Sequence, residues 1–242
     1  MNQPKERPIL FKGEMVNAIL PGWKNQTRRL VKLPDLYMRH PEWLTASFGG
    51  KAYRGKVRFN TGAAPGNAPM EDFGVECPYG KPGDRLWVRE SHAFSVIDPE
   101  GNDWREDPDN WDVVYRADNN KEGLNWRNAD GEVIPAPWRP SIHMPRWASR
   151  ILLEITDVRV ERLQDINEAD AKAEGVTPNC SMLDHSACGD HGNEFIHYMN
   201  GADDFPAFSA VESFESLWQS INGPDSWEAN PWVWVVEFKR VE

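Results

Sequence analysis

The chain has few cysteines and no long apolar run, and these absences exclude several classes of protein. Its 242 residues include only Cys77, Cys180 and Cys188. An odd, low count provides no disulfide framework and fits a reducing compartment. There is no run of about 18 apolar residues, and residues 1–14 lack the apolar segment of a signal peptide. We therefore predict a cytoplasmic protein with no membrane contact.

Several familiar catalytic signatures are missing as well. The sequence contains no phosphate-binding glycine loop, no dinucleotide fingerprint and no nucleophile elbow of the serine hydrolases. It also contains no internal repeat and no coiled-coil heptads. Any chemistry must therefore come from a less common constellation of side chains.

Positive charge is scarce overall but concentrated near the N-terminus. The net charge of −11 argues against a surface that binds nucleic acid everywhere. Residues 1–58 nevertheless hold twelve Lys and Arg against four acidic residues, a net of +8. A basic segment on an acidic body can create a local field that attracts phosphate. The alternative is a random fluctuation in surface charge, together with an acidic face that keeps the protein in solution.

Short periodic segments predict a mixed structure of strands and a few short helices. Apolar residues alternate in several segments, and residues 13–20 show the i,i+4 spacing of a helix. The 12 tryptophans should lie mostly in the core, with a few lining a site. The predicted strands are 8–11, 28–31, 84–90, 113–115, 150–161 and the segment that follows Pro231.

Two further helices are indicated by their capping residues. Asn167 can accept from the N–H of Asp170, and Gly175 suits the position that ends a helix. Ser209 and Glu212 form a capping box at the start of the second helix. The buried face of that second helix is expected to contain Val211, Phe214, Leu217 or Trp218, and Ile221.

The segment from Gly22 to Arg29 carries the clearest chemical pattern. Lys24 and Thr27 are three residues apart and would face one another in a helical turn. A hydroxyl becomes a nucleophile when a base removes its proton, and a lysine with a lowered pKa can be that base. Arg29 would help to lower the lysine pKa or grip a phosphate or carbonyl oxygen. An ordinary basic surface turn is the alternative.

The same segment resembles the signature of ASCH domains, Gly-x-Lys-x-x-(Glu/Thr)-x-Arg, with Gly22, Lys24, Thr27 and Arg29 at its positions. The chain is also similar to proteins of lambdoid prophages. The resemblance implies an α+β fold, a PUA-like small β-barrel with short flanking helices. Further segments that match in order are 81–88, 163–175 and 234–239.

The resemblance implies one ASCH-like domain over residues 1–242, with long loop insertions. These insertions are expected at about 33–78, 98–140 and 177–206, which are rich in Gly, Pro, Asn and Asp. They have no counterpart in a minimal ASCH domain. They could therefore reshape or close a pocket.

One branch of the family is similar to a bacterial amidohydrolase that removes acetyl from N4-acetylcytidine. This similarity implies Lys24 as base, Thr27 as nucleophile and Glu174 as proton donor, with no required cofactor. Glu174 precedes the helix end at Gly175, where the helix dipole favours a protonated carboxyl by roughly 0.3–1 kcal/mol. A solvated helix residue is the alternative for Glu174.

Additional substrate-binding residues are expected around this site. Gly22, Trp23 and Arg29 belong to the motif, and Trp23 could stack on a base or pack in the core. Arg146 and Trp147 combine a cation with an aromatic ring, which suits a base and its phosphate. The alternative for them is a cation–π contact at the rim of the fold.

A structural zinc site is a further possibility, in the third predicted insertion. Thiolate and imidazole ligands suit tetrahedral zinc, and a bound ion would order a polar loop. A free loop without metal is the alternative. The candidate ligands are Cys180, His185, Cys188 and His191.

Three functions are compatible with the sequence. The first is an amidohydrolase that acts on an acylated nucleoside, and the second is a non-catalytic module that binds RNA or a modified base. The third is a phage assembly or interaction protein with a phage or host partner, which would expose an apolar patch away from any pocket.

Overall fold

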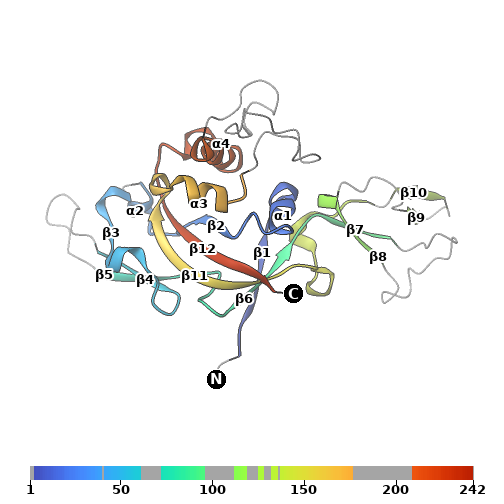
Figure 1. The fold of residues 1–242 in the computed structure, drawn as a ribbon, viewed down its shortest axis with the longest axis horizontal. Coiled ribbons are helices and arrows are strands. Elements are labelled where there is room, and N and C mark those ends of the chain that lie inside the picture. Colours follow the sequence, from blue (N-terminus) through green and yellow to red (C-terminus); the bar gives the residue numbers. More distant parts are fainter. Residues whose placement is uncertain are drawn as a thin grey trace.

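The centre of the fold is a five-stranded sheet with the order β1-β6-β11-β12-β2 (Figure 1). Strands β1 and β6 run parallel, and every other neighbouring pair is antiparallel. The strands are β1 (Glu6–Leu10), β6 (Arg85–Arg89), β11 (Leu152–Arg162), β12 (Trp232–Val241) and β2 (Gln26–Leu30). The computed structural model describes residues 3–39, 41–60, 72–95, 112–118, 125–127, 132–135, 137–176 and 209–241.

Strand β12 lies at the centre of the hydrophobic core, because other parts of the chain cover both of its faces. Four successive residues, 233–236, are buried. If one face of the strand were in contact with solvent, every second residue would be exposed. Helices lie against one side of the curved β11–β12 pair, and a smaller sheet packs near its end (Figure 1). All six predicted strands are present, with boundaries shifted by no more than a few residues.

The helices are short, and the two predicted N-caps, Asn167 and Ser209, are confirmed. Asn167 accepts a hydrogen bond from the N–H of Asp170, and Ser209 accepts one from the N–H of Glu212. Ile221 was predicted to be buried, which is wrong: it is 47% exposed, in the last turn of the helix that Ser209 caps. The helices are α1 (Gly13–Ile19), α2 (Asp35–Arg39), α3 (Glu168–Ala173) and α4 (Ala210–Asn222).

Residues 33–78 were expected to form a loop, and this was wrong. They contain α2 and a three-stranded sheet of β3 (Thr45–Ala46), β4 (Lys56–Asn60) and β5 (Asp72–Glu76). Val57 and Phe59 alternate with polar neighbours and are buried, and Phe59 meets Trp232 edge-on at 5.2 Å. The strands are too short for their period of two to stand out from the surrounding Gly and Asn residues.

The second expected insertion, 98–140, also contains strands where it is described. The predicted strand at 113–115 is β8 (Asp112–Tyr115), which pairs with β7 (His92–Ser95). A second pair joins β9 (Asn125–Arg127) to β10 (Val133–Pro135). The third expected insertion, 177–206, lies outside the described residues.

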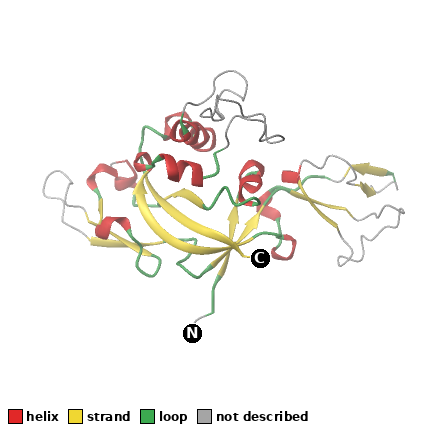
Figure 2. Ribbon diagram, viewed as in Figure 1, coloured by secondary structure: helices red, strands yellow, loops and turns green. Residues whose placement is uncertain are grey.

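The architecture is α+β, mostly sheet with few helices (Figure 2). The expected barrel is not closed among the described strands, because β1 and β2 are edge strands with no backbone ladder between them. Instead, the Arg29 side chain on β2 donates to the Leu10 carbonyl on β1, at 2.7 Å. None of the helices in the described segments has the length and apolar character that a membrane crossing requires.

Candidate functional site

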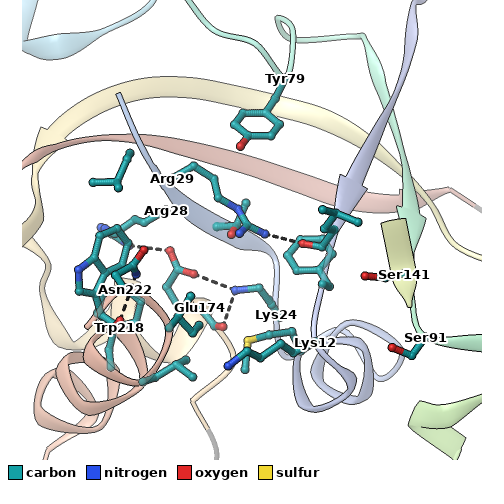
Figure 3. A pocket seen from close by; sticks show the side chains of 18 of the residues that line it. Lys12, Lys24, Arg28, Arg29, Tyr79, Ser91, Ser141, Glu174, Trp218 and Asn222 are labelled. Carbon is teal, nitrogen blue, oxygen red and sulfur yellow. Dashed lines mark hydrogen bonds and ion pairs between the residues drawn. The ribbon is translucent and has the colours of Figure 1, made fainter. Parts of the chain in front are cut away.

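A cavity of about 500 Å³ opens beside the two edge strands and helix α4 (Figure 3). This volume falls within the range of small-molecule sites, about 300–1,000 Å³. Its apolar wall consists of Phe11, Met15, Phe214, Leu217 and Trp218. Its polar lining comes from Lys12, Lys24, Thr27, Arg28, Arg29, Lys32, Tyr79, Ser91, Ser141, Glu174 and Asn222, and its apolar edge from Leu10, Leu30 and Ile221.

A buried ion pair between Lys24 and Glu174 lies in this cavity. The Lys24 ammonium donates to Glu174 Oε2 at 2.8 Å and to the Glu174 carbonyl at 2.6 Å. Only 2% and 4% of the two side chains are exposed. The third N–H of the ammonium has no acceptor among the described residues. The ammonium is therefore hydrogen-bonded to one residue, lies over the Phe11 ring at 5.8 Å, and keeps one N–H for a ligand.

Backbone contacts bring the Lys24 segment to the end of helix α3. The Lys24 N–H donates to the Ala18 carbonyl at 2.9 Å, and the Asn25 N–H donates to the Ala173 carbonyl at 3.0 Å. Gly175 ends α3 with a φ of +81°, and a Cβ there would lie 2.8 Å from the Lys24 Cβ. Glycine is therefore needed at this position both for its backbone conformation and for the approach of Lys24.

Arg28, which no sequence pattern indicated, is the central cation of the site. Its side chain is fully buried, and its guanidinium contacts three carboxylates: Glu174 at 3.2 Å, Glu161 at 3.0 Å and Asp170 at 3.1 Å. Figure 3 shows Glu174 between Arg28 and Lys24. Arg28 falls at an unspecified position of the motif, and nothing local to the sequence indicates three acidic partners.

A second arginine shares two of these carboxylates, Glu161 and Asp170. Arg159 on β11 pairs with Glu161, with Glu237 and, at 3.5 Å, with Asp170. Each of the carboxylates beneath the cavity thus faces at least one guanidinium or ammonium group. Three cations and four carboxylates make up the network, and the most exposed carboxylate is Glu237, so every buried charge has an opposite partner, as buried ionic groups need.

Burial lowers the pKa of Lys24 below its ordinary value. The neighbouring Arg29 and Arg28 lower it further, whereas Glu174 acts in the opposite direction, both by its charge and by its hydrogen bond. The net direction is downward, which makes the neutral amine more accessible than in an exposed lysine. The predicted contribution of Arg29 therefore has the expected sign.

Thr27 lies in strand β2, opposite Val236 of β12, and not in a helical turn with Lys24. The helical expectation was wrong because β2 begins at Gln26, so Thr27 belongs to the sheet ladder. Thr27 still lines the cavity, and only 4% of it is exposed. Its hydroxyl has no hydrogen-bond partner in the described part of the chain. The three motif-derived residues Lys24, Thr27 and Glu174 therefore share one cavity.

Glu174 was expected to be a carboxyl influenced mainly by the helix dipole, but two cations contact it. It is the C-cap residue of α3, as predicted, but its two oxygens accept from Lys24 and from Arg28. In this arrangement it is an ion-pair acceptor. Any proton that it donates has to reach it first from Lys24 or from a ligand.

The other predicted binding residues divide into two groups. Arg29 lines the cavity, whereas Gly22 and Trp23 do not, and Trp23 is 43% exposed. Arg146 and Trp147 also lie outside the cavity lining. Arg146 pairs with Glu6 at 2.9 Å, and Trp147 stacks on Phe94 at 5.3 Å while remaining 58% exposed.

The described residues hold no cluster of three or more His, Cys, Asp or Glu side chains with metal-binding geometry. The zinc candidates fall in residues 177–208, which the structure does not describe. The zinc hypothesis therefore stays a prediction, confined to Cys180, His185, Cys188 and His191.

Comparison of the chain with protein-family models, with curated proteins and with solved structures gives no match. Functional conclusions about this chain therefore depend on its own residues.

Proposed function

We propose that the chain is an ASCH-type protein of PUA-like ancestry whose cavity hydrolyses the amide of an acylated, cytidine-type nucleoside. The observation that carries the proposal is the convergence of Lys24, Thr27 and Glu174 on one cavity. A buried amine with a lowered pKa, an unpartnered hydroxyl and a carboxyl in contact with the amine are the groups that amide hydrolysis needs.

The first half of the reaction acylates Thr27. The Lys24–Glu174 hydrogen bond lets a proton move to the carboxylate, which leaves a neutral amine beside a protonated acid. Lys24 then takes the Thr27 proton as the Thr27 oxygen attacks the acyl carbon. The carbon–nitrogen bond breaks, and Glu174 gives its proton to the leaving amine. The pair ends this step as ammonium and carboxylate, with the acyl group on Thr27.

The second half returns the site to its starting state. Water attacks the ester carbon and gives one proton to Glu174, while its hydroxyl becomes part of the released carboxylic acid. The Thr27 oxygen leaves and recovers a proton from the Lys24 ammonium, and Glu174 then returns its proton to the Lys24 amine. One water is consumed, and one amine and one acid are formed, without a cofactor.

The apolar wall suits a flat base. Phe11, Phe214 and Trp218 offer aromatic surface for stacking. The indole N–H of Trp218 is buried and has no acceptor among the described residues. A carbonyl oxygen of a pyrimidine ring would satisfy that donor, which supports a base as the ligand.

A second candidate is a module that binds RNA or a modified base without catalysis. It is favoured by the resting geometry, in which the Lys24 ammonium donates to Glu174 and to no side-chain oxygen of Thr27. A module that only binds its ligand needs the aromatic side chains of the apolar wall and the cations that line the cavity. Turnover separates the two candidates.

The test is incubation of the full chain with N4-acetylcytidine and a panel of acylated nucleosides, with products measured by mass spectrometry. Thr27→Val keeps the β-branched shape but removes the nucleophile, and Lys24→Met removes the base while Arg28 still neutralises Glu174. Each should reduce turnover by about 10²–10⁴-fold. Lys172→Met, at an exposed position of α3, is the matched control and should leave turnover unchanged.

The pH dependence provides a second readout. Because the Lys24–Glu174 pair must keep the one proton that Glu174 gives to the leaving amine, turnover should fall as pH rises through the pKa of Lys24, which lies below the 10.5 of an ordinary lysine. If folded protein leaves the whole panel intact, the amidohydrolase is excluded and the binding module stands.

A further inference from the structure

The opening of the cavity carries cations that the proposed chemistry does not use. The cavity lining includes five Lys or Arg residues and only one carboxylate, on a chain whose net charge is −11. Lys24 and Arg28 are neutralised by Glu174, Glu161 and Asp170. Three cations therefore remain, Lys12, Arg29 and Lys32.

None of these three has a carboxylate within ion-pair distance in the described part of the chain. Lys12 and Lys32 are exposed and lie where the cavity meets solvent. Arg29 is half-buried, donates to the Leu10 carbonyl and lies over the Phe11 ring at 5.3 Å. Its Nε is buried and has no hydrogen-bond partner. A buried guanidinium nitrogen without an acceptor is a donor that an anionic ligand would satisfy.

Two similar segments supply the lysines. Strand β1 continues as Leu10-Phe11-Lys12, and strand β2 continues as Leu30-Val31-Lys32. In both, an exposed leucine and an exposed lysine flank a buried apolar residue: Leu10 is 41% and Leu30 is 42% exposed. The two strands are opposite edges of the sheet, yet both ends line one cavity, and Arg29 links them.

We infer that Lys12, Arg29 and Lys32 form a phosphate subsite at the opening of this cavity. The ligand is therefore a phosphorylated nucleoside, and not a neutral one. This inference rests on the proposed function for the base, which lies inward beside Thr27, whereas the phosphate stays at the opening. A free nucleotide and the end of an RNA chain share this chemistry.

The experiment measures binding by the full chain, without any turnover. Cytidine, cytidine 5′-monophosphate, a short oligocytidylate and inorganic phosphate are titrated by calorimetry, and phosphate also by ³¹P NMR. A phosphate that gains charge-assisted hydrogen bonds should make the monophosphate bind roughly tenfold or more tightly than cytidine. The advantage should shrink as salt is raised.

The double variant Lys12→Gln/Lys32→Gln should remove most of this advantage, and weaken inorganic phosphate, without changing cytidine affinity. Lys51→Gln/Lys172→Gln loses the same charge at exposed positions outside the cavity lining and should behave as the unmodified chain. Tighter binding of the oligonucleotide identifies RNA as the phosphate source, and tighter binding of the monophosphate identifies a free nucleotide; both support the subsite.

Equal affinity for cytidine and its monophosphate overturns the subsite, as does an equal loss in both double variants. These results are independent of hydrolysis. Phosphate binding that depends on Lys12 and Lys32, together with intact acylated nucleosides, would reject the amidohydrolase and leave the subsite standing.

Discussion

At the residue scale, the site depends on one fully buried arginine. Removing a partner from a buried ionic group is costly, about 3–5 kcal/mol, because the remaining charges lose their compensation. Arg28 compensates three carboxylates, so its main contribution is to hold Glu161, Asp170 and Glu174 near one another. The Lys24–Glu174 ion pair can then form beside the other two carboxylates.

Gly175 offers the sharpest test at this scale. Gly175→Ala should lower the free energy of unfolding by about 1–2 kcal/mol for its left-handed backbone and by about 1–3 kcal/mol more for overpacking. The added Cβ would lie 2.8 Å from the Cβ atoms of Ala18 and Lys24. Urea denaturation measures the loss.

Gly22→Ala is the matched control. Its φ is +85°, close to the +81° of Gly175, but no atom lies within 4 Å of an added Cβ. It should show only the backbone cost. Equal losses in the two variants would mean that Lys24 is not packed against the helix end as described.

At the element scale, the N-terminus of helix α4 is capped by two side chains, one from the residue before the helix and one from helix α3. Ser209 accepts from the N–H of Glu212 at 3.0 Å. Glu168, on α3, accepts from the N–H groups of Ala210 and Val211 at 3.0 and 3.3 Å. The two helices are thereby joined through a cap, and α4 carries much of the apolar wall of the cavity.

Ser209→Ala should therefore lower the free energy of unfolding by about 1 kcal/mol, since it leaves a first-turn N–H without its acceptor. Thermal or urea denaturation of the full chain measures the effect. Ser220→Ala, within the same helix, removes a hydroxyl that donates to the Leu217 carbonyl and caps nothing. Its effect should stay within about 0.5 kcal/mol, and an equal loss there would contradict the capping role.

At the scale of the whole molecule, stability should be uneven. Strand β12 is paired on both sides, with β11 and β2, and lies in the main core. The β7–β8 pair is two-stranded, extends away from the central sheet (Figure 1), and packs on a small cluster of Phe94, Met144 and Ala148. Two-stranded ribbons are marginally stable by themselves.

Hydrogen exchange should reveal this difference. Backbone amides at residues 233–236 should exchange at a rate set by global unfolding, and paired amides of β7 and β8 at least about a hundredfold faster through local opening. Exchange measured by NMR on the full chain provides the comparison. Uniform protection across both regions would show that the β7–β8 pair unfolds together with the core.

Local hydrogen bonds and short-range periodicity were enough to predict much of the fold. The caps at Asn167 and Ser209, the glycine at 175 and the long strands β11 and β12 depend on residues a few positions apart, so the sequence determines them directly. The short strands β3, β4 and β5 were missed because pairing with one another, and not their own pattern, stabilises them.

The motif also placed Lys24 and Thr27 together, although in the wrong local structure. The family resemblance predicted that Lys24 and Glu174, 150 residues apart, act at one site, but only the tertiary structure shows their ion pair and the position of Arg28 among three carboxylates. It likewise placed Lys12 and Lys32, from opposite edges of the sheet, at one opening. The physical reason is that strand register and sheet curvature set these distances, and both arise from packing across the whole molecule and not from any short stretch of sequence.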